Sequence, residues 1–76
     1  MNMKKELSCK IEKHYAVLST TKAGWTKELN RVSWNGNPAK LDIREWNRDK
    51  TSMSKGITLT DDEASALLVA LSAMNE

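Results

Sequence analysis

Hydrophobic and polar residues alternate along the first half of the chain, which predicts two β-strands. Residues 7–19 (LSCKIEKHYAVLS) place most of their apolar side chains at every second position, the period of a half-buried strand. Residues 25–34 (WTKELNRVSW) begin with the same period, but their apolar positions then slip by one residue. A β-bulge inserts one extra residue into a strand, so we expect a bulge near Asn30 and Arg31.

A third strand and a fourth strand follow the turn sequence NGNP at residues 35–38. Asn-Gly favours the positive φ angles of a tight turn, and proline cannot donate to a strand ladder. Residues 39–46 (AKLDIREW) alternate so that Leu41 and Ile43 share the face expected to join the core. Residues 55–60 (KGITLT) give a shorter strand. The opposite face of the third strand carries Lys40, Asp42, Arg44 and Trp46.

The last part of the chain has the pattern of one α-helix, from residue 61 to about residue 75. Thr60 and Glu63 form a capping box at its start. Between Ala64 and Met74 only two serines are polar, so the helix is apolar nearly all round and must be buried on more than one side. A small sheet covers one side only, and we therefore expect a second subunit in a two-fold dimer. The residues expected at this dimer interface are Leu67, Leu68, Leu71 and Met74.

The length and composition indicate a single small domain that needs a partner. A chain of 76 residues, taken as one domain over residues 1–76, builds a core worth only about 3–5 kcal/mol. Cys9 is the only cysteine and His14 the only histidine, which excludes an internal disulfide and a zinc site with three or four nitrogen and sulfur ligands. Oligomerisation is then the expected source of extra stability. Four strands followed by one helix give the fold class α+β.

The sequence shows no membrane span, no signal peptide and no catalytic motif. No apolar run approaches the 18 or so residues of a membrane span, and residues 1–8 turn polar at once. A lone thiol suits a reducing compartment, so we expect a cytoplasmic protein. Cys9 and His14 would face opposite ways in a regular strand, and there is no Gly-rich phosphate loop. We therefore expect no enzymatic activity, no cofactor, no metal and no small-molecule substrate.

The charges are divided unevenly along the chain, and the positive part favours a polyanionic partner. Residues 1–60 carry all 12 Lys and Arg residues against six acids, a net charge of +6, whereas residues 61–76 carry four acids and no base. Single-stranded nucleic acid is bound by cations along its backbone and by flat side chains against its bases. The candidate site residues, on or beside the last three strands, are Lys22, Trp25, Lys27, Arg31, Trp34, Lys40, Arg44, Trp46 and Lys55.

The three tryptophans divide between core and binding surface. Trp34 is in phase with Val32, which favours a place in the core. Trp46 shares the face of Lys40 and is the best candidate for stacking on a base. Trp25 fits either role. For the charges, the alternative is an ordinary solvated sheet surface with weak ion pairs.

One acid interrupts the basic face of the third strand. Asp42 lies between Lys40 and Arg44 in the alternation. Because a carboxylate repels phosphate, we expect Asp42 to orient Arg44 or a neighbouring lysine rather than to contact nucleic acid. Cys9 and His14 are interpreted as structural residues.

Three blocks of the sequence resemble one known family. DIREW at residues 42–46, followed by KGITLTDDE at residues 55–63, is similar to the single-stranded-DNA-binding domain of the transcriptional coactivator positive cofactor four family, in its short bacterial and phage branch. GWTKELNRVSWNG at residues 24–36 resembles a further block of that branch, and the match covers about residues 6–74. The hairpin NGNPAK departs from the Lys-Gly-Lys type of the eukaryotic members. The eukaryotic serine-rich tail has no counterpart, so a coactivator role does not follow from the resemblance.

The resemblance implies a curved four-stranded antiparallel sheet with one helix, a homodimer, and a surface that binds single-stranded DNA with little sequence preference. It places binding positions at Arg44 and Lys55, and in the bacterial-type blocks at Lys27, Arg31, Trp34 and Lys40. The expected function is single-stranded DNA binding in transcription regulation, replication or repair, in the cytoplasm with the nucleoid. The alternative is a small dimeric protein-interaction module that docks on a polymerase or a replication protein. RNA stays open as a ligand, because nothing in the sequence reads a 2′-hydroxyl.

Overall fold

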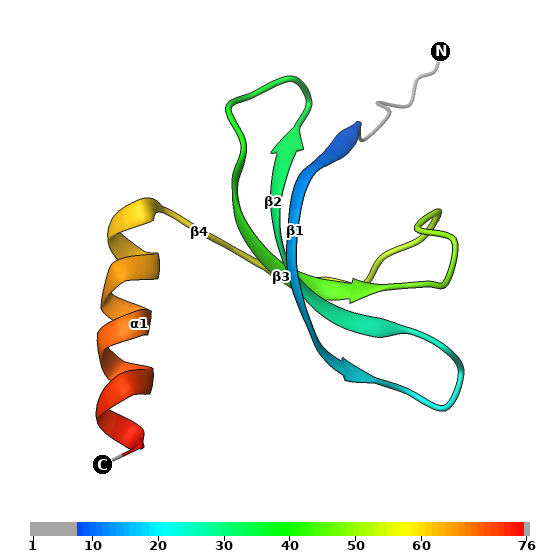
Figure 1. Ribbon diagram of the computed structural model, residues 1–76. Helices are drawn as coiled ribbons and strands as arrows, with labels where there is room; N and C mark the ends of the chain where they lie inside the picture. Colours follow the sequence, from blue (N-terminus) through cyan, green and yellow to red (C-terminus); the bar gives the residue numbers. More distant parts are fainter. Residues whose placement is uncertain (1–7, 76) are drawn as a thin grey trace.

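The computed structural model describes residues 8–75, and it shows an open antiparallel sheet followed by one helix (Figure 1). The strands are β1 (Cys9–Thr20), β2 (Thr26–Trp34), β3 (Lys40–Trp46) and β4 (Ile57–Leu59), and the helix is α1 (Asp61–Met74). The strand order is β1-β2-β3-β4, so each strand pairs with its neighbour in the sequence. The predicted α+β fold is confirmed. Residue 7, where the first strand was expected to begin, lies outside the described residues.

The irregular pairing lies in β1 and not in β2. The predicted bulge near Asn30 and Arg31 is wrong, because β2 pairs with β3 without interruption over residues 26–32. The pairing of β1 with β2 shifts its register at three points, and at each of them β1 carries an extra residue. The extra residues are Glu12, Tyr15 and Leu18.

The slip of the apolar pattern in β2 arises because both faces of the sheet are packed. Leu29 points to the face that α1 approaches, whereas Val32 points to the opposite face. A strand that is packed on two sides loses strict alternation, and no bulge is needed to explain it. The helix face is defined by Leu29, Leu41, Ile43, Ile57 and Leu59, and the network face by Glu28, Asn30, Val32, Asp42 and Arg44.

The buried core is mostly polar and lies largely on the network face. In the described chain the buried hydrophobic residues are Val32 and Trp46. Trp46 is only 2 % exposed, so the expectation that it offers an open ring for base stacking is wrong. Met53, in the loop after β3, forms an antiparallel bridge with Trp46 and therefore lies beside it at the end of β3. The buried polar residues are Glu28, Asn30, Ser33 and Asp42.

Helix α1 is capped as expected but lightly packed. The Thr60 hydroxyl accepts from the Glu63 backbone N–H at 3.1 Å, and the Glu63 carboxylate accepts from the Thr60 N–H at 2.8 Å, which completes the capping box. None of the 14 residues of α1 is buried. In residues 8–75 no helix has the length and apolar character needed to cross a membrane. The side of α1 nearest the helix face carries Leu67, Leu68 and Leu71, around an apolar hollow of about 160 Å³.

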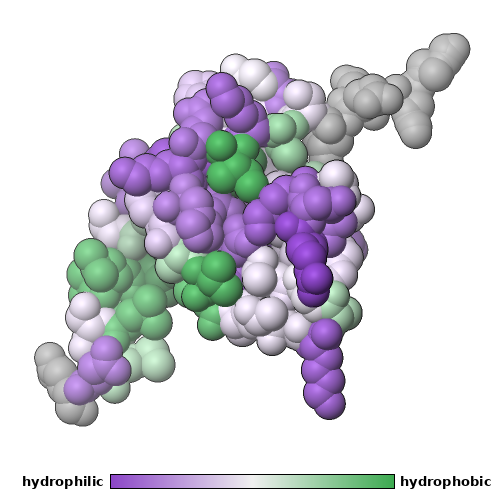
Figure 2. Space-filling view, turned by 45° about the vertical axis from the view of Figure 1, so that its right-hand side comes forward, coloured by the Kyte–Doolittle hydropathy of each residue, from purple (hydrophilic) through white to green (hydrophobic). Residues whose placement is uncertain are grey.

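The single chain leaves apolar surface uncovered. Its radius of gyration is 14.2 Å, whereas a compact domain of this length has a radius of about 11 Å. Figure 1 shows α1 standing beside the curved sheet and joined to it through β4. Figure 2 shows apolar surface gathered at this end of the molecule and hydrophilic surface over much of the sheet. The chain therefore presents two different surfaces, one apolar and one charged.

Candidate nucleic-acid interface

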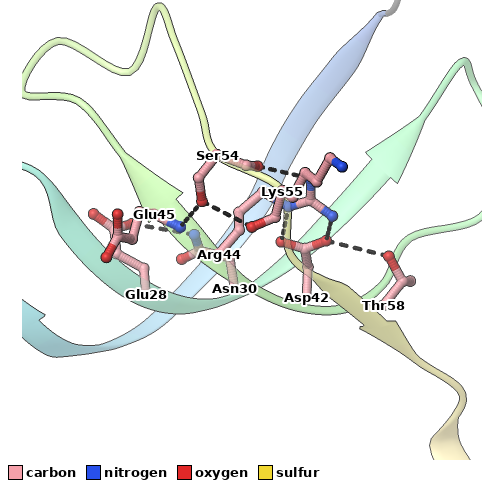
Figure 3. A network of polar contacts seen from close by, with 8 residues as sticks. All are labelled: Glu28, Asn30, Asp42, Arg44, Glu45, Ser54, Lys55 and Thr58. Carbon is pink, nitrogen blue, oxygen red and sulfur yellow. Dashed lines mark hydrogen bonds and ion pairs between the residues drawn. The ribbon is translucent and has the colours of Figure 1, made fainter.

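The centre of the network face is a fork of hydrogen bonds between Asp42 and Arg44 on β3 (Figure 3). Arg44 Nε donates to Asp42 Oδ1 and Arg44 Nη2 donates to Asp42 Oδ2, both at 2.7 Å. Asp42 is fully buried, and the Arg44 side chain is 13 % exposed. Two parallel charge-assisted hydrogen bonds of this kind fix the plane of the guanidinium. Asp42 thus orients Arg44, as expected from the sequence.

The Arg44 guanidinium also covers the ring of Trp34, at the end of β2. Arg44 Cζ lies 4.5 Å from the ring centroid, which is cation–π geometry. Trp34 is partly exposed, and with Lys40 it lines an open hollow of about 250 Å³, which we call the Trp34 hollow. A flat ring and an ammonium group in one hollow are the two elements that single-stranded nucleic acid requires. The hollow is completed by Asn37, Pro38 and Thr58.

A second cationic hollow lies where β3 meets the segment that leads into β4. Lys27 and Lys55 both line this open space of about 360 Å³, which we call the Lys55 hollow, and Arg44 contributes to its wall. Gly56 lets the segment approach β3 closely, since a Cβ at this position would lie 2.3 Å from the carbonyl oxygen of Ile43. Glycine is therefore required to hold Lys55 at the edge of β3.

A second polar cluster surrounds Glu28, at the centre of β2. Lys50 and Thr26 both donate to Glu28 Oε2, and Asn30 Nδ2 donates to Oε1 at 3.1 Å. Burial by itself raises the pKa of Glu28, but the hydrogen bonds from Lys50, Thr26 and Asn30 outweigh it and the pKa is lowered. The cluster reaches β1 through His14, whose Nδ1 lies 2.7 Å from Asn30 Oδ1. Within residues 8–75, no group of three or more His, Cys, Asp and Glu side chains is placed to hold a metal ion.

Other predicted site residues lie away from the two hollows. Lys22 and Trp25 are in or beside the β1–β2 turn, at the end of β2 opposite to the Trp34 hollow. Arg31 is directed to the helix face, where its Nε donates to the Tyr15 hydroxyl at 3.3 Å and its Nη1 lies 3.6 Å from Asp61 Oδ1. The predicted set is therefore divided between two faces and two ends of the sheet, and only part of it forms a continuous surface.

Sequence reasoning missed the buried polar residues that support the site. Thr58 Oγ1 donates to Asp42 Oδ2 at 3.3 Å, and Glu28 ties the loop after β3 to β2 through Lys50. A signal was present in β2, where Glu28 and Asn30 have the same phase as Val32. Polar and apolar residues in one phase indicate a face that is buried and hydrogen-bonded rather than solvated.

A comparison with models of known protein families identifies the family to which this chain belongs. The family model described as Transcriptional Coactivator p15 (PC4) matches residues 21–70, which span β2, β3, β4 and most of α1. The chain belongs to this family. An uncharacterized protein of Treponema pallidum (strain Nichols) is 46% identical over 65 residues, which are 86% of this chain and 76% of that protein. The PC4 match confirms the family resemblance seen in the DIREW and KGITLT blocks.

Proposed function

We propose that this PC4 family protein binds single-stranded DNA with little sequence preference. The observation that carries the proposal is the Trp34 hollow, in which a partly exposed indole ring and the exposed Lys40 lie together. An unstacked base would lie on the ring while the ammonium group neutralises a neighbouring phosphate. Stacking accepts any base, so the site carries no sequence preference.

The Lys55 hollow lies on the helix face, since Ile43 and Ile57 help to line it, so a strand would reach it from the Trp34 hollow only by passing round the β4 edge of the sheet. Lys27 of β2, which pairs with Glu45 of β3, and Lys55 before β4 would add two cations there. Each phosphate that is neutralised releases counterions and adds salt-dependent affinity. The buried Trp46 takes no part in this path, and Trp25 and Lys22 would meet only a strand that extends to the β1–β2 turn.

We also propose that the functional unit is a homodimer joined through α1. Leu68 is 66% exposed and Met74 is 75% exposed, although the helix carries them among other apolar residues. Leu67 and Leu71 are also exposed and border the open apolar hollow on the helix face. A second copy that covers this surface would bury the predicted interface residues and leave both Trp34 hollows to one DNA strand.

The family and the free thiol of Cys9 support a role beside chromosomal DNA. A DNA-binding, coactivator-like protein acts where single strands are exposed, in transcription, replication or repair. Cys9 is free and partly exposed, which suits a reducing compartment such as the cytoplasm. We propose a nucleoid-associated role on these grounds.

A fluorescence anisotropy titration tests the proposed activity. Labelled oligo-dT, a duplex of the same length and a matching RNA would be titrated at one salt concentration, and the oligo-dT titration repeated between about 50 and 200 mM salt. We expect oligo-dT to bind more tightly than the duplex and its affinity to fall steeply with salt. Binding no tighter than to duplex DNA, or no response to salt, would contradict the proposal. Equal affinity for RNA would widen the ligand class to both nucleic acids.

A further inference from the structure

We propose that Arg44 does not neutralise DNA phosphate but acts with Asp42 as a positioning pair that holds the ring of Trp34 ready for stacking. This inference rests on the proposed function and changes the role of a residue expected to be a phosphate cation. The positioning would act through a chain of contacts from Asp42 through Arg44 to Trp34. Three features of the network face carry it.

The first feature is that the charge and three of the five donors of Arg44 are already used. Asp42 accepts from Nε and Nη2, and the Ser54 backbone carbonyl accepts from Nη1 at 3.3 Å. An arginine has five N–H donors in a fixed plane, and three of them are directed to protein oxygens here. The adjacent carboxylate, fully buried, balances the positive charge. A phosphate would find a weak and crowded partner at this position.

The second feature is that the indole of Trp34 has few other restraints. Its Nε1 is buried, and no group within residues 8–75 accepts a hydrogen bond from it. The guanidinium at 4.5 Å from the ring centroid is therefore the directional contact on this side chain. Arg44 is not among the residues that line the Trp34 hollow, so it contacts the ring without filling the space offered to a base. A ring held in place before binding loses less conformational entropy when the base stacks.

The third feature is that the pair is fixed from two further segments. Thr58 of β4 donates to Asp42 Oδ2, and the Ser54 hydroxyl accepts from the Glu45 backbone N–H at 3.0 Å (Figure 3). The plane of the guanidinium is thus set by β3, β4 and the segment before β4 together. Trp34, on β2, receives its orientation from all of them through one cation.

The salt dependence of binding distinguishes a cation that positions Trp34 from a cation that neutralises a DNA phosphate. For single-stranded DNA, the slope of log K against log salt changes by about 0.7 when one phosphate is no longer neutralised by the protein. We expect Lys40→Met to reduce the slope by about 0.7, and Arg44→Met to weaken binding about tenfold with an unchanged slope. We expect Arg44→Lys to behave like Arg44→Met, because an ammonium group cannot form the fork or lie flat on the ring.

A double-mutant cycle tests whether Arg44 acts through Trp34. If the proposal holds, Arg44→Met in a Trp34→Ala background causes little further loss of affinity. Because Arg44→Met leaves Asp42 buried without its partner, the double variant Asp42→Leu with Arg44→Met is measured beside it. Replacing a buried ion pair by apolar residues is often neutral for stability, so this variant keeps the fold. It should reproduce the tenfold loss and the unchanged slope, with circular dichroism and Tm recorded for every variant.

The outcomes separate the inference from the function on which it rests. If the unmodified protein does not bind oligo-dT, the proposed function fails. If it binds and Arg44→Met lowers the slope by about 0.7, or Arg44→Lys restores full affinity, Arg44 contacts phosphate and the positioning role is overturned. Additive losses from Trp34→Ala and Arg44→Met overturn it as well. The same holds if the folded double variant binds as tightly as the unmodified protein.

Discussion

The ammonium group of Lys50 lies against the carboxylate of Glu28 and ties the loop after β3 to the centre of β2. Lys50 adopts a positive φ of 63°, a conformation that residues other than glycine seldom adopt, and Glu28 is 1% exposed. A left-handed residue and a buried carboxylate are both unfavourable alone. Together they fix a loop that has no regular secondary structure, and Ser54 and Lys55 follow from that loop into the site.

The lowered pKa of Glu28 predicts that the protein loses stability in acid. The ordinary pKa of a glutamate is about 4.3, and a carboxylate with a lower pKa in the folded state stabilises the protein above that pH. This stability is lost as the pH falls through the lowered pKa. In urea unfolding between pH 7 and pH 2, Glu28→Gln should flatten the decrease and lower stability at pH 7 by about 1–3 kcal/mol. Glu12→Gln, an exposed acid on β1, is the control and should retain the original pH profile. If Glu28→Gln keeps the original dependence of stability on pH, the Glu28 cluster is not the cause of the loss of stability in acid.

The close approach of Gly56 to β3 predicts a strong effect from one added methyl group. In Gly56→Ala the new Cβ would lie 2.3 Å from both the Ile43 carbonyl oxygen and Arg44 Cβ, so the segment before β4 must move away. We expect a loss of about 1–3 kcal/mol in urea unfolding, together with weaker DNA binding because Lys55 moves with the segment. Gly36→Asn is the control: the residue meets nothing within 4 Å, and asparagine tolerates its φ of 79°. Equal stability of Gly56→Ala and Gly36→Asn would contradict the steric argument.

The two lysines of the Lys55 hollow should each contribute one phosphate contact. Lys27→Met and Lys55→Met should each lower the salt slope of oligo-dT binding by about 0.7, and the double variant by about 1.4. Lys10→Met is the matched control, because Lys10 is an exposed lysine on β1, paired with Ser33 and outside both hollows. Slopes that change as much in Lys10→Met as in the other variants would indicate a diffuse charge effect instead of a site.

The apolar surface of α1 predicts dimerisation that a single charge disrupts. Sedimentation equilibrium should give twice the 8.6 kDa chain mass for the unmodified protein. Leu68→Glu places a charge on the exposed apolar surface and should shift the mass to one chain at micromolar concentration. Ser65→Glu adds the same charge at one of the two serines, Ser65 and Ser72, which lie seven residues apart on one side of the helix, and should leave the dimer intact. A monomeric unmodified protein would refute the proposed assembly.

The burial of Trp46 predicts that its role is structural. Trp46→Leu retains an apolar side chain in the core but offers no flat ring, so oligo-dT affinity should stay within about twofold while Tm falls. Trp34→Leu is the matched comparison, and it should lose about tenfold in affinity because the ring itself is the platform. A large loss of affinity in a folded Trp46→Leu protein would show that Trp46 contributes to DNA binding and would contradict the structural role.

The sequence predicted the elements well because their signals are local. The capping box of Thr60 and Glu63 located the start of α1, and the NGNP turn separated β2 from β3, both within a few residues of the observed bounds. The pairing of Asp42 with Arg44 could also be predicted, since two residues on one face of a strand are neighbours.

The pattern of residues carries no signal for the path of the loop after β3, and the curvature of the sheet was expected only from the family resemblance. Both influence which side chains are buried: Trp46 is buried at the end of β3, beside Met53, while Trp34 remains partly exposed. The position of the register shifts was missed for a similar reason. An extra residue in β1 has no sequence signature until its partner on β2 is known, because alternation is judged within one strand.

The three extra residues of β1 have a consequence for the behaviour of the protein at high concentration. β1 is the longest strand and forms one edge of the sheet, with a row of backbone groups that could template the addition of another chain. Glu12, Tyr15 and Leu18 interrupt the regular spacing of those groups, so a straight incoming strand finds no continuous ladder. The three register shifts therefore disfavour the addition of further strands at this edge, the route by which a sheet protein forms fibres.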